Sequence, residues 1–143
     1  MTGLGDQLER AATIESEVLL IIPPFGCPTR PVYHAFDRLL GGNVQHASFE
    51  RVRGLMNEPT PLCERALFND LTRAAAAVAP DLEPLRSRIA SMIDRPVHVT
   101  GSGSCMFALP SAAADPALRS SWVRSVEAAG ACAVWTRFAA REA

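Results

Sequence analysis

Residues 97–109 read VHVTGSGSCMFAL, and this stretch decides the predicted fold. Two apolar runs, 97–100 and 105–109, lie on either side of the glycine-rich segment 101–104. Apolar runs of this length around a short glycine turn are typical of a β-hairpin. Gly101 and Gly103 permit the positive φ angles that a tight turn needs. We therefore expect two paired strands joined by a close loop.

Two further strands are expected outside the hairpin. Glu17–Ile22 reads EVLLII and stops at two prolines, which suits a buried strand that ends in a loop. Residues 131–138 form another apolar run and predict a final strand. Residues 3–12 fit both a short helix and an extended lead-in, and this choice stays open.

Helices are expected at both ends of the region between these strands. Thr29 can cap the first one, with Pro31 in its first turn, and two glycines stop it at Gly41. The last one has the clearest start, since Asp115 is a good cap and Pro116 suits the first helical position. Gly130 ends this helix.

Two more helices are expected between residues 62 and 94, after a loop over 43–61. An apolar stripe of period 3.6 starts near Leu62 and stops before Pro80. This stripe would bury Asp70, whose carboxylate would then need an arginine or a backbone N–H as partner. A second stripe runs from a cap at Asp81 to Asp94.

The order is therefore strand, helices, strand, strand, helix, strand. It corresponds to the α+β, ferredoxin-like β-α-β-β-α-β split arrangement, with extra helices in the first crossover. We see no internal repeat and no linker, so residues 1–143 are predicted to form a single domain. A chain of this length buries enough surface to hold a core without metals or disulfides.

The composition excludes several classes of protein. The formal net charge is −1, and the 14 cationic residues are all arginine, so there is no basic cluster for nucleic acid and no lysine for a Schiff base or a P-loop. No apolar run approaches the roughly 20 residues of a membrane helix, and the N-terminal residues lack the apolar core of a secretion signal. We therefore expect a cytoplasmic chain without nucleic-acid or membrane partners.

The cysteines and histidines offer little for metal or nucleophilic chemistry. Four cysteines are far apart and show no zinc spacing, so we expect free thiols, most of them buried: Cys27, Cys63, Cys105 and Cys132. Cys105 could in principle act as a nucleophile with His98 as base. We favour a core position for Cys105 and solvent exposure for His98.

The glycine-rich segment is the sharpest local feature for function. Its backbone N–H groups could surround an anion, because glycine permits the backbone angles of an anion-binding nest. The segment joins two strands, carries no lysine and has the wrong register for a dinucleotide fingerprint, a Walker loop or an esterase elbow. A hairpin turn without any ligand stays open as the alternative.

Three segments together resemble one enzyme family. They read PPFGCPTRPVYHAFD at 23–37, NDL at 69–71 and TGSGSCMFAL at 100–109. Their order and spacing are similar to those of the C-terminal half of the 4-diphosphocytidyl-2-C-methyl-D-erythritol kinases, a family of GHMP small-molecule kinases in the non-mevalonate isoprenoid pathway. The resemblance implies the ferredoxin-like C-terminal domain of that family. It also implies transfer of the γ-phosphate of ATP, with magnesium, to a cytidine-diphosphate-linked small-molecule substrate.

The resemblance also assigns roles to particular residues. Thr29 and Tyr33 would lie at the cytidine end, with the Tyr33 ring stacked on cytosine. The third motif of the superfamily would pack against the substrate where two domains meet, and its residues here are Gly101, Ser102, Gly103 and Ser104. No catalytic residue and no metal ligand is assigned to this chain.

The sequence departs from the family at the catalytic machinery. No segment matches the family's GLGGGSSD loop or its catalytic aspartate and lysine, which lie in an N-terminal ATP-binding domain. ATP and magnesium are therefore expected only in the complete enzyme, and this chain alone is expected to be inactive and without cofactor. It would need an N-terminal kinase half, in cis or in trans.

This departure leaves the nature of the chain open. One interpretation is half an enzyme: an isolated domain, the product of a gene with a misplaced start or one part of a split kinase. The face meant for the other half would then favour self-association. The alternative is a stand-alone ferredoxin-like module that binds a small anion, a nucleotide or a partner protein without catalysis.

Overall fold

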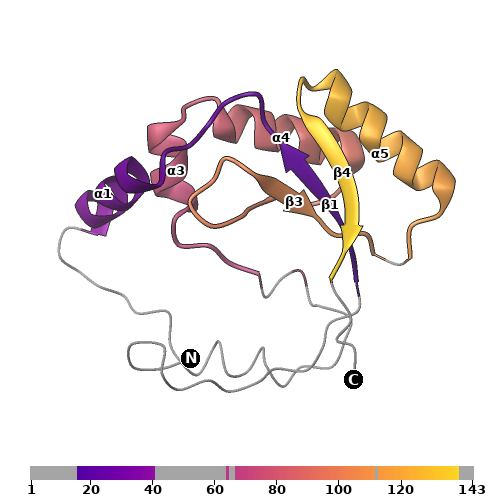
Figure 1. Cartoon of the computed structure of the whole chain (residues 1–143), viewed down its shortest axis with the longest axis horizontal. Coiled ribbons are helices and arrows are strands. Elements are labelled where there is room, and N and C mark those ends of the chain that lie inside the picture. Colours follow the sequence, from indigo (N-terminus) through magenta and orange to yellow (C-terminus); the bar gives the residue numbers. More distant parts are fainter. Residues whose placement is uncertain (1–15, 41–63, 65–66, 112, 139–143) are drawn as a thin grey trace, which may run out of the picture.

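The computed structural model of the chain describes residues 16–40, 64, 67–111 and 113–138. Figure 1 shows helices and strands in mixed order along the chain. Within the described residues these are β1 (Glu17–Ile22), α1 (Thr29–Leu40), α3 (Thr72–Val78), α4 (Leu82–Ile93), β2 (His98–Val99), β3 (Met106–Ala108), α5 (Pro116–Ala128) and β4 (Cys132–Arg137). The predicted hairpin is confirmed, and so are the strands predicted before and after it in the sequence, β1 and β4.

The described strands form one antiparallel sheet in the order β2-β3-β1-β4. Strand β1 lies in the centre, where Leu19 pairs with Ala108 of β3 and with Trp135 of β4. The hairpin adds β2 outside β3, with Val99 opposite Met106. The described part is thus an α+β fold with a four-stranded antiparallel sheet and four helices, as the sequence predicts in outline.

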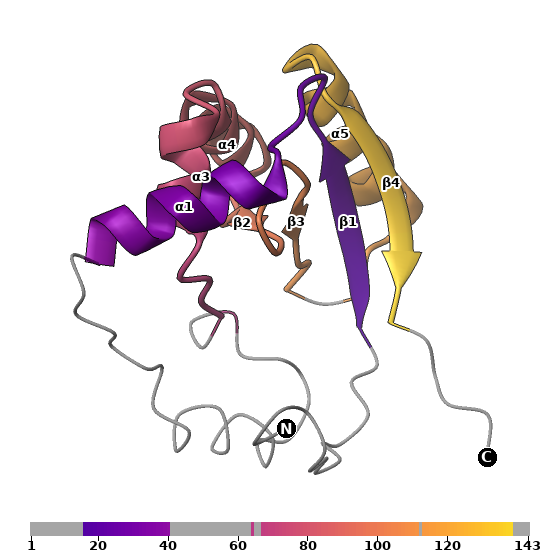
Figure 2. The ribbon, with the colours of Figure 1, turned by 60° about the vertical axis from the view of Figure 1, so that its left-hand side comes forward.

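The core lies between the sheet and the long helices behind it. Leu19 and Ile21 of β1 are fully buried, as are Ile89 of α4 and Val126 of α5. Figures 1 and 2 show α4 and α5 behind the sheet and α1 on the side of β2. Successive residues of a strand point to opposite faces, so Leu20 and Ile22 face away from this core.

The ends of two helices follow the sequence signals closely. The side chain of Asp115 accepts a hydrogen bond of 2.7 Å from the N–H of Leu118, and Pro116 is the first residue of α5. Helix α4 ends at Asp94, which takes a left-handed conformation with φ at 51°. Asp81 precedes α4 as expected, but its side chain forms no capping bond.

The helix predicted from Leu62 is wrong in its start. Helix α3 begins only at Thr72, and the described residues before it, 67–71, are not helical. The side chain of Asn69 accepts a hydrogen bond of 3.0 Å from the N–H of Leu71 and so forms a turn at this point. Asp70 is consequently exposed, and the prediction that its carboxylate is buried is wrong.

The expectations for the cysteines have mixed outcomes. Of the cysteines, Cys27 is buried, whereas Cys105 and Cys132 are exposed, so the buried position predicted for these two is wrong. Cys63, the predicted loop 43–61 and the ambiguous stretch 3–12 lie outside the described residues.

No helix among the described residues is long and apolar enough to span a membrane.

Candidate functional site

The glycine-rich segment forms a tight loop between β2 and β3. The N–H of Thr100 donates to the carbonyl of Cys105 at 3.0 Å, and the N–H of Gly103 donates to the carbonyl of Thr100 at 2.9 Å. Gly101 and Gly103 have φ angles of 53° and 82°. Both angles lie in the left-handed region, which glycine adopts without the cost that a side chain brings.

Gly103 is also closely packed. A Cβ atom at this position would lie 3.4 Å from both Cβ and Sγ of Cys27 and 3.6 Å from Cβ of Ala75. At Gly101 the same atom would meet nothing within 4 Å. The loop therefore passes directly over Cys27 and α3 at Gly103, while Gly101 faces open space.

Two hydroxyl groups join this loop to the segment around the start of α1. Ser104 donates a hydrogen bond of 2.6 Å to the carbonyl of Phe25. The hydroxyl oxygens of Thr29 and Ser102 lie 3.1 Å apart, within hydrogen-bond distance. The structure thus brings together Thr29 and the loop 101–104, which the sequence places far apart.

Tyr33 lies one turn further along α1. It follows Thr29 by four residues, so the two side chains leave the helix on the same face. Tyr33 is 52% exposed and is not part of the core. An aromatic ring with this exposure, one helical turn from Thr29, is suited to stacking on a planar ligand.

Asn69 is a site residue that the sequence analysis missed. Its Nδ2 group donates to the carbonyls of Val99 and Gly101, both at 2.8 Å. It therefore links the turn before α3 to the end of β2 and to the first residue of the glycine loop. One feature of the sequence indicates a turn at this position: Asn69 interrupts the apolar stripe, and asparagine favours turns over helix interiors.

The groups gathered at this site suit the binding of a polar ligand. Its groups are the hydroxyls of Thr29 and Ser102, the phenol of Tyr33 and backbone N–H groups at a helix start. The first turn of α1 contains no acidic residue. Such groups can hold an anion or a polar ligand.

His98 has a separate environment from this loop. Its ring stacks on Phe107 with 5.2 Å between ring centres, and its Nε2 lies 3.8 Å from a carboxylate oxygen of Glu64. Burial is the main cause that lowers the pKa of His98, while the nearby Glu64 opposes this effect. The prediction that His98 faces solvent is wrong, since only 22% of its side chain is exposed.

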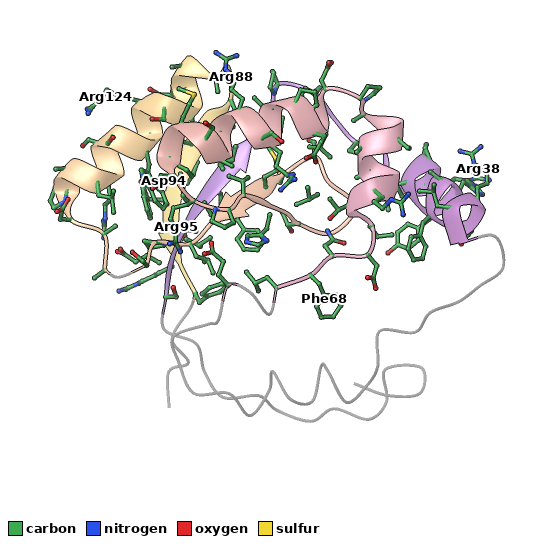
Figure 3. All side chains as sticks on the ribbon, turned by 180° about the vertical axis from the view of Figure 1, so that it is seen from behind. Arg38, Phe68, Arg88, Asp94, Arg95 and Arg124 are labelled. Carbon is green, nitrogen blue, oxygen red and sulfur yellow. The ribbon has the colours of Figure 1, made fainter. Side chains whose placement is uncertain are left out.

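Glu64 is held in turn by an arginine. Arg95 follows α4, where Figure 3 labels it beside Asp94, and its Nη2 lies 2.6 Å from the other Glu64 oxygen. A small cavity of about 110 Å³ lies nearby, and Phe68, His98 and Asn69 are among the residues that line it. Figure 3 labels Phe68. The described contacts of His98 are with Glu64 and Phe107, and none of them involves the exposed thiol of Cys105. These contacts therefore do not support Cys105 as a nucleophile with His98 as its base.

Comparison with known proteins places these features in context. No family model matches the chain. A curated relative, 4-diphosphocytidyl-2-C-methyl-D-erythritol kinase from Protochlamydia amoebophila (strain UWE25), is 28% identical over 109 residues. The match covers 76% of this chain and 34% of that protein, so the chain spans well under two thirds of its relative.

Two solved structures share the fold. A crystal structure of 4-(cytidine 5'-diphospho)-2C-methyl-D-erythritol kinase matches with a TM-score of 0.60 and 24% identity, over 92% of this chain and 46% of that one. Phosphomevalonate kinase from Streptococcus pneumoniae matches with a TM-score of 0.55 and 15% identity, over 90% and 42%. The resemblance indicated by the three sequence segments is thereby confirmed: this chain is similar to the C-terminal part of 4-diphosphocytidyl-2-C-methyl-D-erythritol kinase.

Proposed function

We propose that this chain is the substrate-side domain of a GHMP-type kinase that phosphorylates a cytidine-diphosphate-linked small molecule. The observation that carries the proposal is the contact between Thr29 at the start of α1 and Ser102 in the glycine loop. This contact joins two of the three segments that resemble the kinase family. The left-handed glycines beside Ser102 and the exposed ring of Tyr33, one turn along α1 from Thr29, support the proposal as well.

In this proposal the ring of Tyr33 stacks on cytosine, because it is exposed and lies one turn from Thr29. Thr29 and Ser102 offer hydroxyl groups to the nucleotide or to the sugar chain of the substrate. Gly101 and Gly103 allow the backbone to approach the ligand closely. Ser104 holds the loop in place through its bond to Phe25.

We further infer that the fold is the ferredoxin-like split arrangement over a single domain, 1–143. The observed element order and the sheet order β2-β3-β1-β4 support this assignment. Helix α4, which lies behind the sheet with α5, is then the regular helix of the first crossover, and α1 and α3 are the additional helices in it.

The remaining parts of the reaction belong to another domain in this proposal. Magnesium prefers carboxylate and phosphate oxygens. The proposed site residues offer hydroxyl and N–H groups, so they do not fit a magnesium site. The chain also has no lysine to contact the phosphates of ATP. We therefore assign ATP, magnesium and proton transfer to an N-terminal kinase half in cis or in trans, and expect this chain alone to be inactive.

The test is calorimetric titration of the 143-residue chain with cytidine 5'-diphosphate, uridine 5'-diphosphate and inorganic pyrophosphate. The proposal predicts that the cytidine compound binds best and that Tyr33→Ala weakens this binding. Equal binding of all three compounds would favour the alternative, a stand-alone module that recognises a small anion. If none of the three compounds binds, both the nucleotide site and the small-anion site are contradicted.

A further inference from the structure

We propose that Asn69 is a positioning residue that sets the conformation of the glycine loop for ligand binding. This inference rests on the proposed function in one respect, since the ligand used to test it is the cytidine nucleotide. Asn69 itself is not proposed to touch the ligand. It acts through the carbonyls of Val99 and Gly101, to which its side chain donates at 2.8 Å each.

The primary amide of Asn69 is suited to this task because it can donate two hydrogen bonds and accept others. Its Nδ2 group holds two carbonyls on either side of Thr100, where β2 ends and the loop begins. Its Oδ1 atom accepts from the N–H of Leu71. The Asn69 side chain thus connects the turn before α3 to the carbonyls of Val99 and Gly101, where the chain enters the loop.

The other described anchors hold the opposite side of the loop. Ser104 is bound to Phe25, and Ser102 lies within hydrogen-bond distance of Thr29. Gly101 has no neighbour within 4 Å of its Cβ position, in contrast to Gly103. Among the described side-chain contacts, the Asn69 amide is therefore the group that holds the loop at Gly101.

Helix α3 strengthens the same connection from a second direction. Ala75 of this helix lies against Gly103, and its carbonyl lies 3.7 Å from the Cys27 sulfur. Asn69 stands in the turn that leads into α3. Asn69 thus links Gly101 to the turn before α3, while Gly103 packs against Ala75 of the same helix. A change at Asn69 should therefore alter the loop first at Gly101.

The informative variant is Asn69→Asp, which keeps the size of the side chain and the acceptor for Leu71. It replaces the donor by a carboxylate oxygen that faces two carbonyl oxygens. Asp70→Asn is the matched control, because it makes the reverse exchange at the next residue, whose side chain is exposed. Asn69→Ala removes the donor without adding charge and serves if the aspartate variant does not fold.

The experiment combines NMR of the backbone amides with calorimetry on the full 143-residue chain. We expect Asn69→Asp to shift the amide resonances of residues 101–104, to speed hydrogen exchange at Gly103, and to weaken binding of cytidine 5'-diphosphate about tenfold. Asp70→Asn should leave the loop resonances and the affinity unchanged. A purely structural role would lower the melting temperature without moving the loop.

The outcomes separate this inference from the proposed function. Unshifted loop resonances in a folded Asn69 variant would overturn the positioning role, whatever happens to affinity. Shifted resonances with unchanged affinity would overturn it as well. A third outcome is that the loop resonances shift in the Asn69 variant while the natural chain binds no cytidine nucleotide. This result would support the hold of Asn69 on the loop and reject the proposed function.

Discussion

The Oγ1 atom of Thr29 lies 3.1 Å from the Oγ atom of Ser102, although 73 residues separate them in the chain. Both side chains lie at the start of a feature that can bind polar ligands, one at a helix N-terminus and the other in a glycine loop. This pair defines the region in which the chain is expected to hold its substrate.

Replacement of Thr29 by valine should weaken nucleotide binding with little effect on stability. The substitution keeps the shape of the side chain and removes its hydroxyl. We expect a loss of about 0.5–1.5 kcal/mol in the binding free energy of cytidine 5'-diphosphate, the usual contribution of one hydrogen bond. Calorimetry measures this value. Thr136→Val, at an exposed position of β4, is the matched control, and an equal loss there would contradict the prediction.

Tyr33→Ala should weaken the same binding by about 1–3 kcal/mol, the range for stacking of a base on an aromatic ring. Because Tyr33 is 52% exposed, the free energy of unfolding should change by no more than about 0.5 kcal/mol. Tyr33→Phe keeps the ring and should bind nearly as well. An unchanged affinity in Tyr33→Ala would sink the stacking assignment.

The two glycines of the loop should respond differently to a larger side chain. Gly103→Val places its methyl groups against Cys27 and Ala75, whereas Gly101→Val points into open space. Both variants adopt an unfavourable positive φ, and packing adds a further cost at Gly103. We expect Gly103→Val to be less stable than Gly101→Val by about 1–3 kcal/mol. Urea denaturation measures the two free energies of unfolding, and equal values would contradict the packing.

Stability should depend on pH through His98. Burial lowers the pKa of His98 in the folded chain, so the unfolded chain binds a proton more readily. The contribution of the neutral ring is complete above the unfolded pKa, about 6.5, and is lost as the pH falls below it. The free energy of unfolding should therefore decrease from pH 7.5 to pH 5.5 more in the natural sequence than in His98→Gln.

Glu83 provides the internal control for this pH window. A hydrogen bond from Arg86 lowers the pKa of Glu83, so its contribution is lost only below the ordinary pKa of a glutamate. Denaturation curves between pH 7.5 and pH 5.5 thus separate the two groups. Identical pH dependence in the natural sequence and in His98→Gln would reject the role of His98. Glu64, Arg86 and Arg95 are the charged groups described around the ring and its partner.

The chain is expected to associate with itself at high concentration. Ile22 and Val134 are 42% and 43% exposed, and both lie on the sheet face that points away from α4 and α5. Neighbouring apolar side chains of this kind favour association. Ile22→Thr combined with Val134→Thr should reduce it. Sedimentation velocity over a range of concentrations measures the effect, and a monomer at all concentrations would count against the prediction.

Local signals were sufficient for several elements of the fold. The residues Asp115 and Pro116 predicted the start of α5, and the run Glu17–Ile22 predicted β1 with its observed bounds. The start of α3 was not predictable in the same way. Its apolar stripe continues back to Leu62, but Asn69 bonds to the carbonyls of Val99 and Gly101, about 30 residues away, and holds a turn instead of a helix.

The candidate site was only partly visible in the sequence. Thr29, Tyr33 and the glycine loop were identified through their resemblance to a kinase family, whereas Asn69 was missed as a site residue because its bonds depend on a distant strand. The exposure of Cys105 and Cys132 was also missed. Their place in apolar runs suggests a core position, but the sheet has one face covered by α4 and α5 and another that these helices leave uncovered.

Local sequence signals are enough to predict the strands, most helix ends and the positions where the chain needs glycine, because these depend on hydrogen bonds and torsion angles between near neighbours. The contacts of Thr29 with Ser102 and of Asn69 with Gly101 arise only when distant segments pack together. Such contacts depend on how β1, the hairpin and the helices pack into one sheet and one core. Packing is a property of the whole chain, and no local pattern encodes it.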